Sequence, residues 1–435
     1  MKFRSLLAAA VVLLVLGGVL YWSEHRKPKE NASSPSQSPT ILKVDPATVT
    51  GLTVKRKDAA PVTLEKSADS KWQITAPVPA AADSEAVSSM LSDLTPLTAE
   101  RVVDDKATNL ATYGLNDPAV ELDITSKGNK ISKLMLGDDT PTGNAVYAAL
   151  AGDPRVFTAG SFVKTGLSKS EDDLRDKRLL PVSADSVSHI ELIRKGQDVE
   201  FGRVKDGWQI EKPQPYRTDT FQVSDLLQQL TSSKWQPAAG SDPAKEFVHA
   251  EPFATVKLTG GSGTDTLEVR REKDDYYAKS SAAGGVYKAD SALGTTLNRG
   301  LDDFRNKQLF DFGYSDPDKV EYHAGATNLV LTHSGSGWTE DGKKMDADSV
   351  EGLVTGLRDL AASKFVDSGY KSPDIQITVT SSSGKKVEKV GIAKSGDSGI
   401  AKRDDGPSLY SLDAVAMNNL NTAVQGVKPA APAKK

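Results

Sequence analysis

The stretch Leu174-Arg175-Asp176-Lys177-Arg178-Leu179-Leu180 returns 130 positions later as Phe304-Arg305-Asn306-Lys307-Gln308-Leu309-Phe310. In both copies, apolar residues flank a charged centre. Such a segment suits a connector between two folded units, because its apolar ends can dock into a core on either side. It also suits a partner surface on which arginines make bidentate contacts. We favour the connector, and the residues of the alternative partner surface are Arg175, Lys177, Arg178, Arg305 and Lys307.

Three tryptophans keep a similar interval. Trp72, Trp208 and Trp338 stand in matching local sequence and are separated by 136 and 130 residues. Self-similarity at such an interval indicates copies of one structural unit. A tryptophan at the same point of a strand in every copy is expected to fill the core between a sheet and a helix. The alternative is that its ring stacks on a sugar or a peptide.

Each copy has the same predicted order of elements. Short alternating runs predict strands, and an apolar stripe at helical spacing predicts one long helix. Further strands follow, separated by turns rich in Gly, Pro and Asn. We therefore expect an α+β fold with three tandem α+β repeats, each with mostly antiparallel strands and one long helix. The first expected helix begins at Asp83 or Ser84. The next two span 220–230 and 348–362, and a short last helix spans 414–424.

The amino terminus carries an apolar run over residues 3–22, whose only charge is Arg4. Its length matches the roughly 30 Å hydrocarbon core of a bilayer. Bulky residues end the run where a signal peptidase needs small ones, so we expect an uncleaved anchor, with a cleaved secretory signal as the alternative. The expected divisions are a transmembrane signal anchor at 1–23, a Ser/Pro linker at 24–44, repeats at 45–182, 183–314 and 315–426 (the last shortened), and a disordered tail at 427–435.

The anchor implies a location. We expect a single-pass protein of the inner (cytoplasmic) membrane, attached through residues 3–22, with its amino terminus inside and its bulk extracytoplasmic, in the periplasm. The chain has no cysteine, which excludes disulfides, thiolate zinc sites, iron–sulfur clusters and a lipidated cysteine. Because the chain has 54 Lys and Arg residues and 58 Asp and Glu residues, we expect no broad basic surface for nucleic acid.

Candidate catalytic motifs are weak. Gly396-Asp397-Ser398-Gly399 matches the nucleophile segment of chymotrypsin-like proteases, but no histidine stands in a matching motif, and its place before a predicted strand favours a hairpin turn. Adjacent acidic pairs form no D-x-D-x-D-G loop, and the histidines show no H-x-x-x-H spacing. No glycine-rich stretch has the phosphate-binding pattern. We expect no catalytic residue, no metal, no cofactor and no nucleotide.

A family resemblance is carried by three stretches in order: YGLNDPAVELDI from Tyr113, KLMLGDDTPTGNAVYA, and RVFTAGSFVKTGLSKSEDDLRDKRLL ending at Leu180. They resemble an uncharacterised bacterial membrane-anchored family, the domain of unknown function numbered 4340. The resemblance is specific over 113–180 and weaker in the later copies, which lack the TPTG turn. It implies no activity. Members often occur with gliding-motility-type ABC export systems, so it implies an envelope partner.

We therefore expect a non-enzymatic, membrane-anchored envelope protein. It would serve as a scaffold or accessory subunit of a membrane complex, with a membrane protein as partner and an ABC-type export system as one such complex. The first alternative is a periplasmic cell-wall or glycan-binding module that uses tryptophan or tyrosine faces. The second is a hydrolase with an unrecognised carboxylate site.

Overall fold

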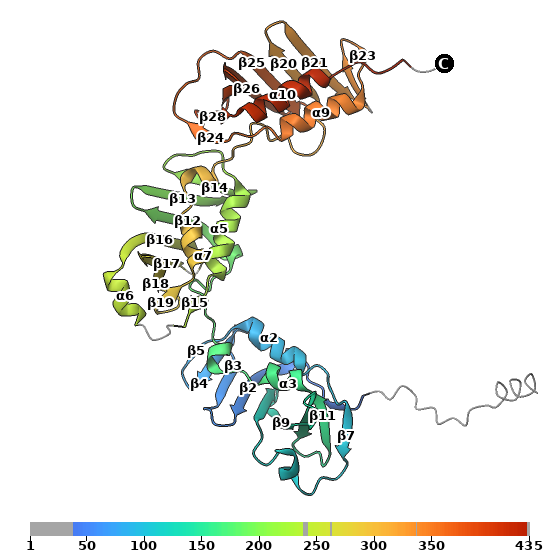
Figure 1. Ribbon diagram of the computed structural model, residues 1–435, viewed down its shortest axis with the longest axis vertical. Helices are drawn as coiled ribbons and strands as arrows, with labels where there is room; N and C mark the ends of the chain where they lie inside the picture. The colour runs from blue at the N-terminus through green and yellow to red at the C-terminus, as the bar shows by residue number, and fades with distance from the viewer. Residues whose placement is uncertain (1–37, 238–241, 262, 336, 433–435) are drawn as a thin grey trace, which may run out of the picture. The chain divides into compact units, whose positions relative to one another are not determined.

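The computed structural model describes residues 38–237, 242–261, 263–335 and 337–432 (Figure 1). It divides into two compact units, Met1–Asp176 and Lys177–Lys435. The first unit contains one large sheet, here sheet 1, and the second contains two, sheets 2 and 3.

Sheet 1 has nine strands in the order β5-β4-β3-β2-β8-β9-β10-β11-β7. A separate pair, β1 (Thr40–Leu42) and β6 (Leu97–Thr98), lies outside it. The strands of sheet 1 are β2 (Val49–Arg56), β3 (Val62–Lys66), β4 (Trp72–Ala76), β5 (Ala80–Ala81), β7 (Arg101–Asp104), β8 (Val120–Ser126), β9 (Lys130–Asp139), β10 (Ala145–Leu150) and β11 (Val156–Gly160).

Sheet 2 has eight strands in the order β14-β13-β12-β16-β17-β18-β19-β15. Its strands are β12 (Val187–Arg194), β13 (Gln197–Val204), β14 (Gly207–Lys212), β15 (Trp235–Gln236), β16 (Glu251–Gly260), β17 (Gly263–Glu272), β18 (Asp275–Ser280) and β19 (Gly285–Ala289).

Sheet 3 has nine strands in the order β23-β22-β21-β20-β25-β26-β27-β28-β24. Its strands are β20 (Lys319–Ala324), β21 (Thr327–Ser334), β22 (Gly337–Glu340), β23 (Lys343–Lys344), β24 (Lys364–Val366), β25 (Ile375–Ser381), β26 (Lys386–Ser395), β27 (Ser398–Arg403) and β28 (Leu409–Leu412). All three large sheets place two hairpin-linked strand groups side by side and join them through the same central pair, β2–β8, β12–β16 and β20–β25.

The expected α+β class is wrong, because the protein is mostly β. It is 44% strand and 22% helix, and neighbouring strands of the large sheets pair antiparallel. One main helix covers only one face of each sheet of eight or nine strands, so strand residues predominate. The main helices lie close to their expected positions, and the class was wrong because strand residues outnumber helix residues.

Each sheet has one main helix, and each begins at an aspartate cap. Asp83, Asp219 and Asp346 accept hydrogen bonds from the first free backbone N–H groups, as helix caps do. These helices bury Val, Leu and Met side chains against their sheets. They are α2 (Ser84–Asp93), α5 (Thr220–Ser232) and α9 (Ala347–Arg358). The shorter helices are α3 (Ser161–Leu167), α4 (Glu171–Leu174), α6 (Pro243–His249), α7 (Ser291–Leu297) and α8 (Leu301–Phe304), with 3-10 turns η1 (Pro46–Thr48), η2 (Leu110–Tyr113) and η3 (Ala184–Ser186).

The last helix, α10 (Ala414–Gly426), is longer than α3 and α7, which follow the last hairpin of the other two sheets. Figure 1 shows α9 and α10 lying side by side across sheet 3. Gly356 on α9 allows this approach, since a Cβ there would lie 3.3 Å from the Ala423 Cβ on α10. The two helices thus form one continuous layer over the sheet.

The repeated charged stretch is a two-sided connector. Its first half pairs with the segment before the main helix: Asp83 donates to the Leu174 carbonyl at 2.8 Å, and Asp219 donates to that of Phe304 at 2.8 Å. Its second half pairs with the segment after the next main helix. There Trp235 donates to the Lys177 carbonyl at 2.8 Å, and Ala362 donates to that of Lys307 at 2.8 Å. The apolar ends that follow, Leu179, Leu180, Leu309 and Phe310, are buried.

Segments near the two ends of the described residues make the same pairings that the halves of a connector make elsewhere. Ala99 donates to the Pro39 carbonyl at 2.7 Å, so residues 39–42, which were expected to belong to a linker, pair instead with the segment after α2. At the other end, Asp346 donates to the Lys428 carbonyl at 3.0 Å, and Ala430 donates to that of Lys344 at 2.9 Å. The expected disorder of 427–435 therefore does not hold for 428–430.

The expected anchor at residues 3–22 lies outside the described residues. Within the ranges that the structure describes, no helix is long and apolar enough to cross a membrane. The expected localisation, a single-pass inner-membrane protein with a periplasmic bulk, is therefore not supported.

We predict that Phe310→Ala lowers the free energy of unfolding by about 3–5 kcal/mol, because it empties a site in the sheet 3 core. Phe310 is 1% exposed. Phe221→Ala is the matched control, since Phe221 on α5 is 75% exposed and its loss should change stability by less than about 0.5 kcal/mol. Urea unfolding followed by circular dichroism measures both. Equal effects of the two substitutions would contradict the docking of the connector.

Candidate functional site

Three titratable side chains meet on the outer face of sheet 2. His189 lies on β12, Glu200 on β13 and Glu211 on β14, which are adjacent strands. Their chain neighbours Ile190 and Phe201 are buried on the opposite face, as the alternation of a half-buried strand requires. Only register, not sequence spacing, brings the three residues together.

A β-bulge aims Glu211 at the other two residues. Glu200 pairs with Lys212 and Phe201 with Ile210, so β14 carries Glu211 as one extra residue. Bulges re-aim side chains in this way and recur next to functional sites. Gly202, opposite His189, leaves the space that Glu211 fills, because a Cβ on Gly202 would lie 1.9 Å from the Glu211 Oε1 atom.

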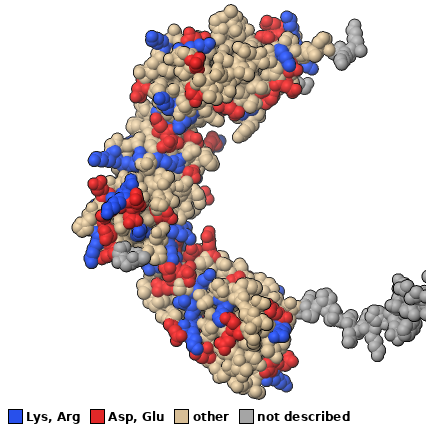
Figure 2. Space-filling view, in the orientation of Figure 1, with Lys and Arg blue, Asp and Glu red and all other residues tan. Residues whose placement is uncertain are grey.

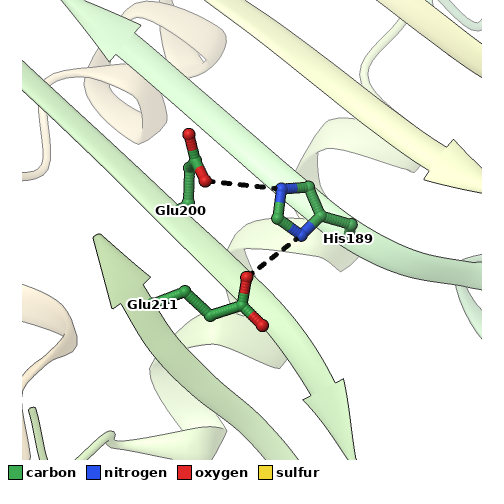
Figure 3. Close-up of side chains that lie close together, drawn as sticks. All are labelled: His189, Glu200 and Glu211. Carbon is green, nitrogen blue, oxygen red and sulfur yellow. Dashed lines mark ion pairs between the residues drawn. The ribbon is translucent and has the colours of Figure 1, made fainter. Parts of the chain in front are cut away.

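The histidine ring lies between the two carboxylates (Figure 3). Its Nδ1 atom is 3.5 Å from Glu211 Oε2, and its Nε2 atom is 3.8 Å from Glu200 Oε2. One ligand atom from each of the three residues lies within 4.8 Å of the others. In the described part of the chain, this is the one such group of metal-ligating side chains. The site is half open, since the Glu211 side chain is 50% exposed and that of His189 is 28% exposed.

A lysine neutralises part of the site's negative charge. Lys212 Nζ lies 2.5 Å from Glu200 Oε1, and this hydrogen bond raises the pKa of the Lys212 ammonium above its usual value. On the far side of β12, Lys257 pairs with Glu191 at 2.8 Å. Two carboxylates, an imidazole and an ammonium can hold a cation or a pair of charged ligand groups. No metal was expected from the sequence, in which neither the strand register nor the bulge that brings these residues together is visible.

Arg305, a candidate residue of the alternative partner surface, lies inside the second unit. Its side chain is 10% exposed, and its guanidinium lies 3.5 Å from the Phe365 ring centroid and 4.1 Å from that of Tyr216. It also donates to Asp302 Oδ1 and to Ser408 Oγ, each at 2.9 Å. Asp302 and Tyr216 belong to the sheet 2 region, and Phe365 and Ser408 to the sheet 3 region. Arg305 therefore joins two regions of one unit.

The other candidate partner-surface residues are also built into the fold. Arg175 forms a bridge with Ala82, and Arg178 forms one with Lys234. The Lys177 ammonium lies 5.6 Å from the Trp235 ring centroid. Lys307 accepts a backbone bond from Ala362. The geometry of this stretch is that of a connector.

The three repeated tryptophans are core residues. Trp72, Trp208 and Trp338 lie on β4, β14 and β22 and are 7%, 3% and 3% exposed. No face of these rings is open to a sugar. Ser398, in the motif that resembles a protease nucleophile, begins β27 at a tight hairpin with Ser395, and its hydroxyl donates to the Ser395 carbonyl at 2.8 Å. The hairpin-turn prediction is confirmed.

A buried ionic group lies under the second connector. Arg403 and Glu388 are each 4% exposed, and Arg403 Nη2 contacts Glu388 Oε1 at 3.1 Å and Asp405 Oδ2 at 2.6 Å. Arg403 also donates to the Leu309 carbonyl. The hydrogen bond from Arg403 lowers the pKa of the Asp405 carboxyl below its usual value. Sequence analysis missed this group.

Comparison with known families gives one match. The model of a family described as a domain of unknown function, DUF4340, matches residues 72–245 and again 208–376, which together cover more than half of the chain. The two matches begin at Trp72 and at Trp208, the equivalent core tryptophans of sheets 1 and 2. No curated protein and no solved structure matches the chain.

We predict that Arg305→Ala destabilises the second unit, because it removes two ring contacts and leaves Asp302 without its cation. A loss of about 1–3 kcal/mol in the free energy of unfolding is expected. Arg305→Lys should restore only part of it, since an ammonium lacks the planar fork. Lys307→Ala is the control, because Lys307 accepts the hydrogen bond from Ala362 with its backbone carbonyl, which the substitution keeps. Unchanged urea midpoints in all three variants would contradict the burial of the Arg305 side chain and place it at the surface.

We predict that Asp405→Asn lowers stability at pH 7 but not in acid. Because the folded pKa of Asp405 lies below its unfolded value of about 3.9, its contribution is complete above that value and is lost as the pH falls through the folded pKa. The urea midpoints of the variant and the parent protein should therefore converge as the pH falls through the folded pKa, which lies below the unfolded value of about 3.9. Asp404→Asn, at the exposed neighbouring position, is the control. If the difference in stability between the variant and the parent protein is constant with pH, the charge of Asp405 is not its cause.

Proposed function

The chain belongs to the DUF4340 family, and because that description names no activity, we propose from the structure that it is a non-enzymatic binding subunit that holds a polypeptide partner. The support comes from the helical layer of sheet 3. A groove of about 740 Å³ runs between α9 and α10. This groove is the observation that carries the proposal.

Short side chains make the groove accessible to a partner. Gly352 and Gly356 line it from α9, and Ala416 and Ala423 from α10. Val415 stands at the groove with 66% of its surface exposed, although it is apolar. Exposed apolar residues beside a groove are typical of protein–protein contact sites.

The charge of the groove favours a basic partner. Its lining includes Asp348, Asp359 and Asp413, and among the lining residues that the structure describes there is no lysine or arginine. Elsewhere, Figure 2 shows both signs of charge interspersed over the visible surface. A polypeptide segment that carries lysine or arginine next to small apolar side chains would complement both the shape and the charge of the groove.

A scaffold or accessory subunit is the role that such a groove serves. An ABC-type export system is one complex in which the subunit would work, a proposal motivated by the family association. The three repeated tryptophans, which the glycan-binding alternative would use, are buried. Turnover of an ester, glycoside or peptide by the purified chain would contradict the proposal.

We predict that a photo-crosslinking amino acid at Val415 captures a discrete partner in cells of the source organism. Val387, an apolar residue of β26 that is 52% exposed and does not line the groove, is the matched control position and should capture nothing specific. Charge reversal of Asp348 and Asp359 to Lys should at least halve the crosslink at position 415 through repulsion of the basic partner. The same pattern at both positions, or no effect of charge reversal, would count against the groove.

A further inference from the structure

We propose that His189, Glu200 and Glu211 form a binding site for a divalent transition-metal ion, with Zn²⁺ the best-fitting ion. The three side chains come from adjacent strands of a rigid sheet, and one ligand atom from each lies within 4.8 Å of the others. This site is separate from the groove on sheet 3, so it stands or falls independently of the proposed function.

The ligand atoms need to move little to bind an ion. A tetrahedral Zn²⁺ lies about 2.1 Å from each ligand, which places the ligand atoms about 3.4 Å apart. An ion on the Nε2 atom of His189 would have Glu200 near that separation, at 3.8 Å, whereas Glu211 lies 3.5 Å from the other ring nitrogen, Nδ1, and must move toward the ion. The largest adjustment falls on Glu211, whose side chain is half exposed and is free to turn.

Two backbone features place the third ligand. The bulge between Glu200 and Lys212 adds Glu211 to β14, and Gly202 gives its carboxylate room beside His189. A polar sheet face stays solvated without a bulge and without a glycine at these positions. Together they bring a second carboxylate to the imidazole, where it costs electrostatic repulsion with Glu200 unless a cation lies between them.

The ligand set selects the class of ion. Imidazole and carboxylate, with no thiolate in the chain, suit Zn²⁺ and related divalent transition metals, whereas Ca²⁺ takes six to eight oxygen ligands. Three protein ligands leave one position for water or for a ligand group.

Lys212 is the competitor of the ion. Its ammonium lies 2.5 Å from Glu200 Oε1 and must share that carboxylate when a metal binds. Removal of the lysine charge should therefore tighten metal binding. If the three residues instead form only an ion pair around a protonated histidine, no metal binds and Lys212 has no such effect.

The test is calorimetric titration of the full chain, stripped of metal with a chelator, with Zn²⁺, and the absorption spectrum of the Co²⁺ form. We expect one Zn²⁺ per chain. His189→Ala should weaken binding by about tenfold or more, and so should Glu211→Gln. Lys212→Met should strengthen it severalfold. His333→Ala is the control, because His333 lies on β21 beside Asp316 and Trp338 and should leave binding unchanged.

Gly202→Ala tests the geometry without removing a ligand, since the added methyl group displaces the Glu211 carboxylate. It should weaken Zn²⁺ binding while the circular dichroism spectrum stays the same, and it keeps the test valid if His189→Ala fails to fold. The proposal is overturned if the parent chain binds no Zn²⁺ up to ~1 mM. It is equally overturned if binding survives His189→Ala and Glu211→Gln unchanged, which would place the ion at another histidine.

Discussion

The connector must satisfy its backbone on both flanks, and the rest of the second unit depends on that constraint. A buried carbonyl without a donor costs as much as a lost hydrogen bond, so each half of the connector needs a partner segment. Sheets 2 and 3 meet this need at equivalent positions but with different donor groups. Ser280, the last residue of β18, donates to the Leu179 carbonyl, whereas Arg403, the last residue of β27, donates to that of Leu309. The two donors therefore stand at equivalent strand ends but differ in their chemical group.

The choice of donor has consequences. A serine hydroxyl brings no charge into the core, but Arg403 brings a guanidinium that is 4% exposed. A buried charge of this kind needs a partner, and Glu388 and Asp405 supply it, while Glu388 also accepts from the Asp311 backbone N–H at 3.0 Å. The ionic group therefore ties the end of the second connector to β26 and β27. Sheet 3 holds its connector through charge, sheet 2 through a neutral hydroxyl.

The sequence allowed prediction of local features and not of pairings. Helix starts at Asp83, Asp219 and Asp346 follow from capping chemistry, which is local. The weight of strand over helix, the pairing of residues 428–430 and the cluster around His189 all depend on which strands become neighbours. A one-residue bulge at Glu211 decides whether three titratable side chains meet, and no spacing rule contains it. Arg305 has a long charged side chain that would suit a surface, yet rings from two sheet regions enclose it.

Each family match spans a whole connector rather than a whole sheet. Both matches begin at a core tryptophan, and each contains one whole connector, 174–180 within 72–245 and 304–310 within 208–376. Each match thus starts inside one sheet and ends inside the next region of the chain, rather than at the edges of one sheet. A sheet without its connector would leave the segments beside its main helix unpaired, as would a connector without both neighbours. The recurring unit of this chain is therefore a connector with the two half-sheets beside it, and the segments 39–42 and 428–430 make the equivalent pairings beside α2 and α9.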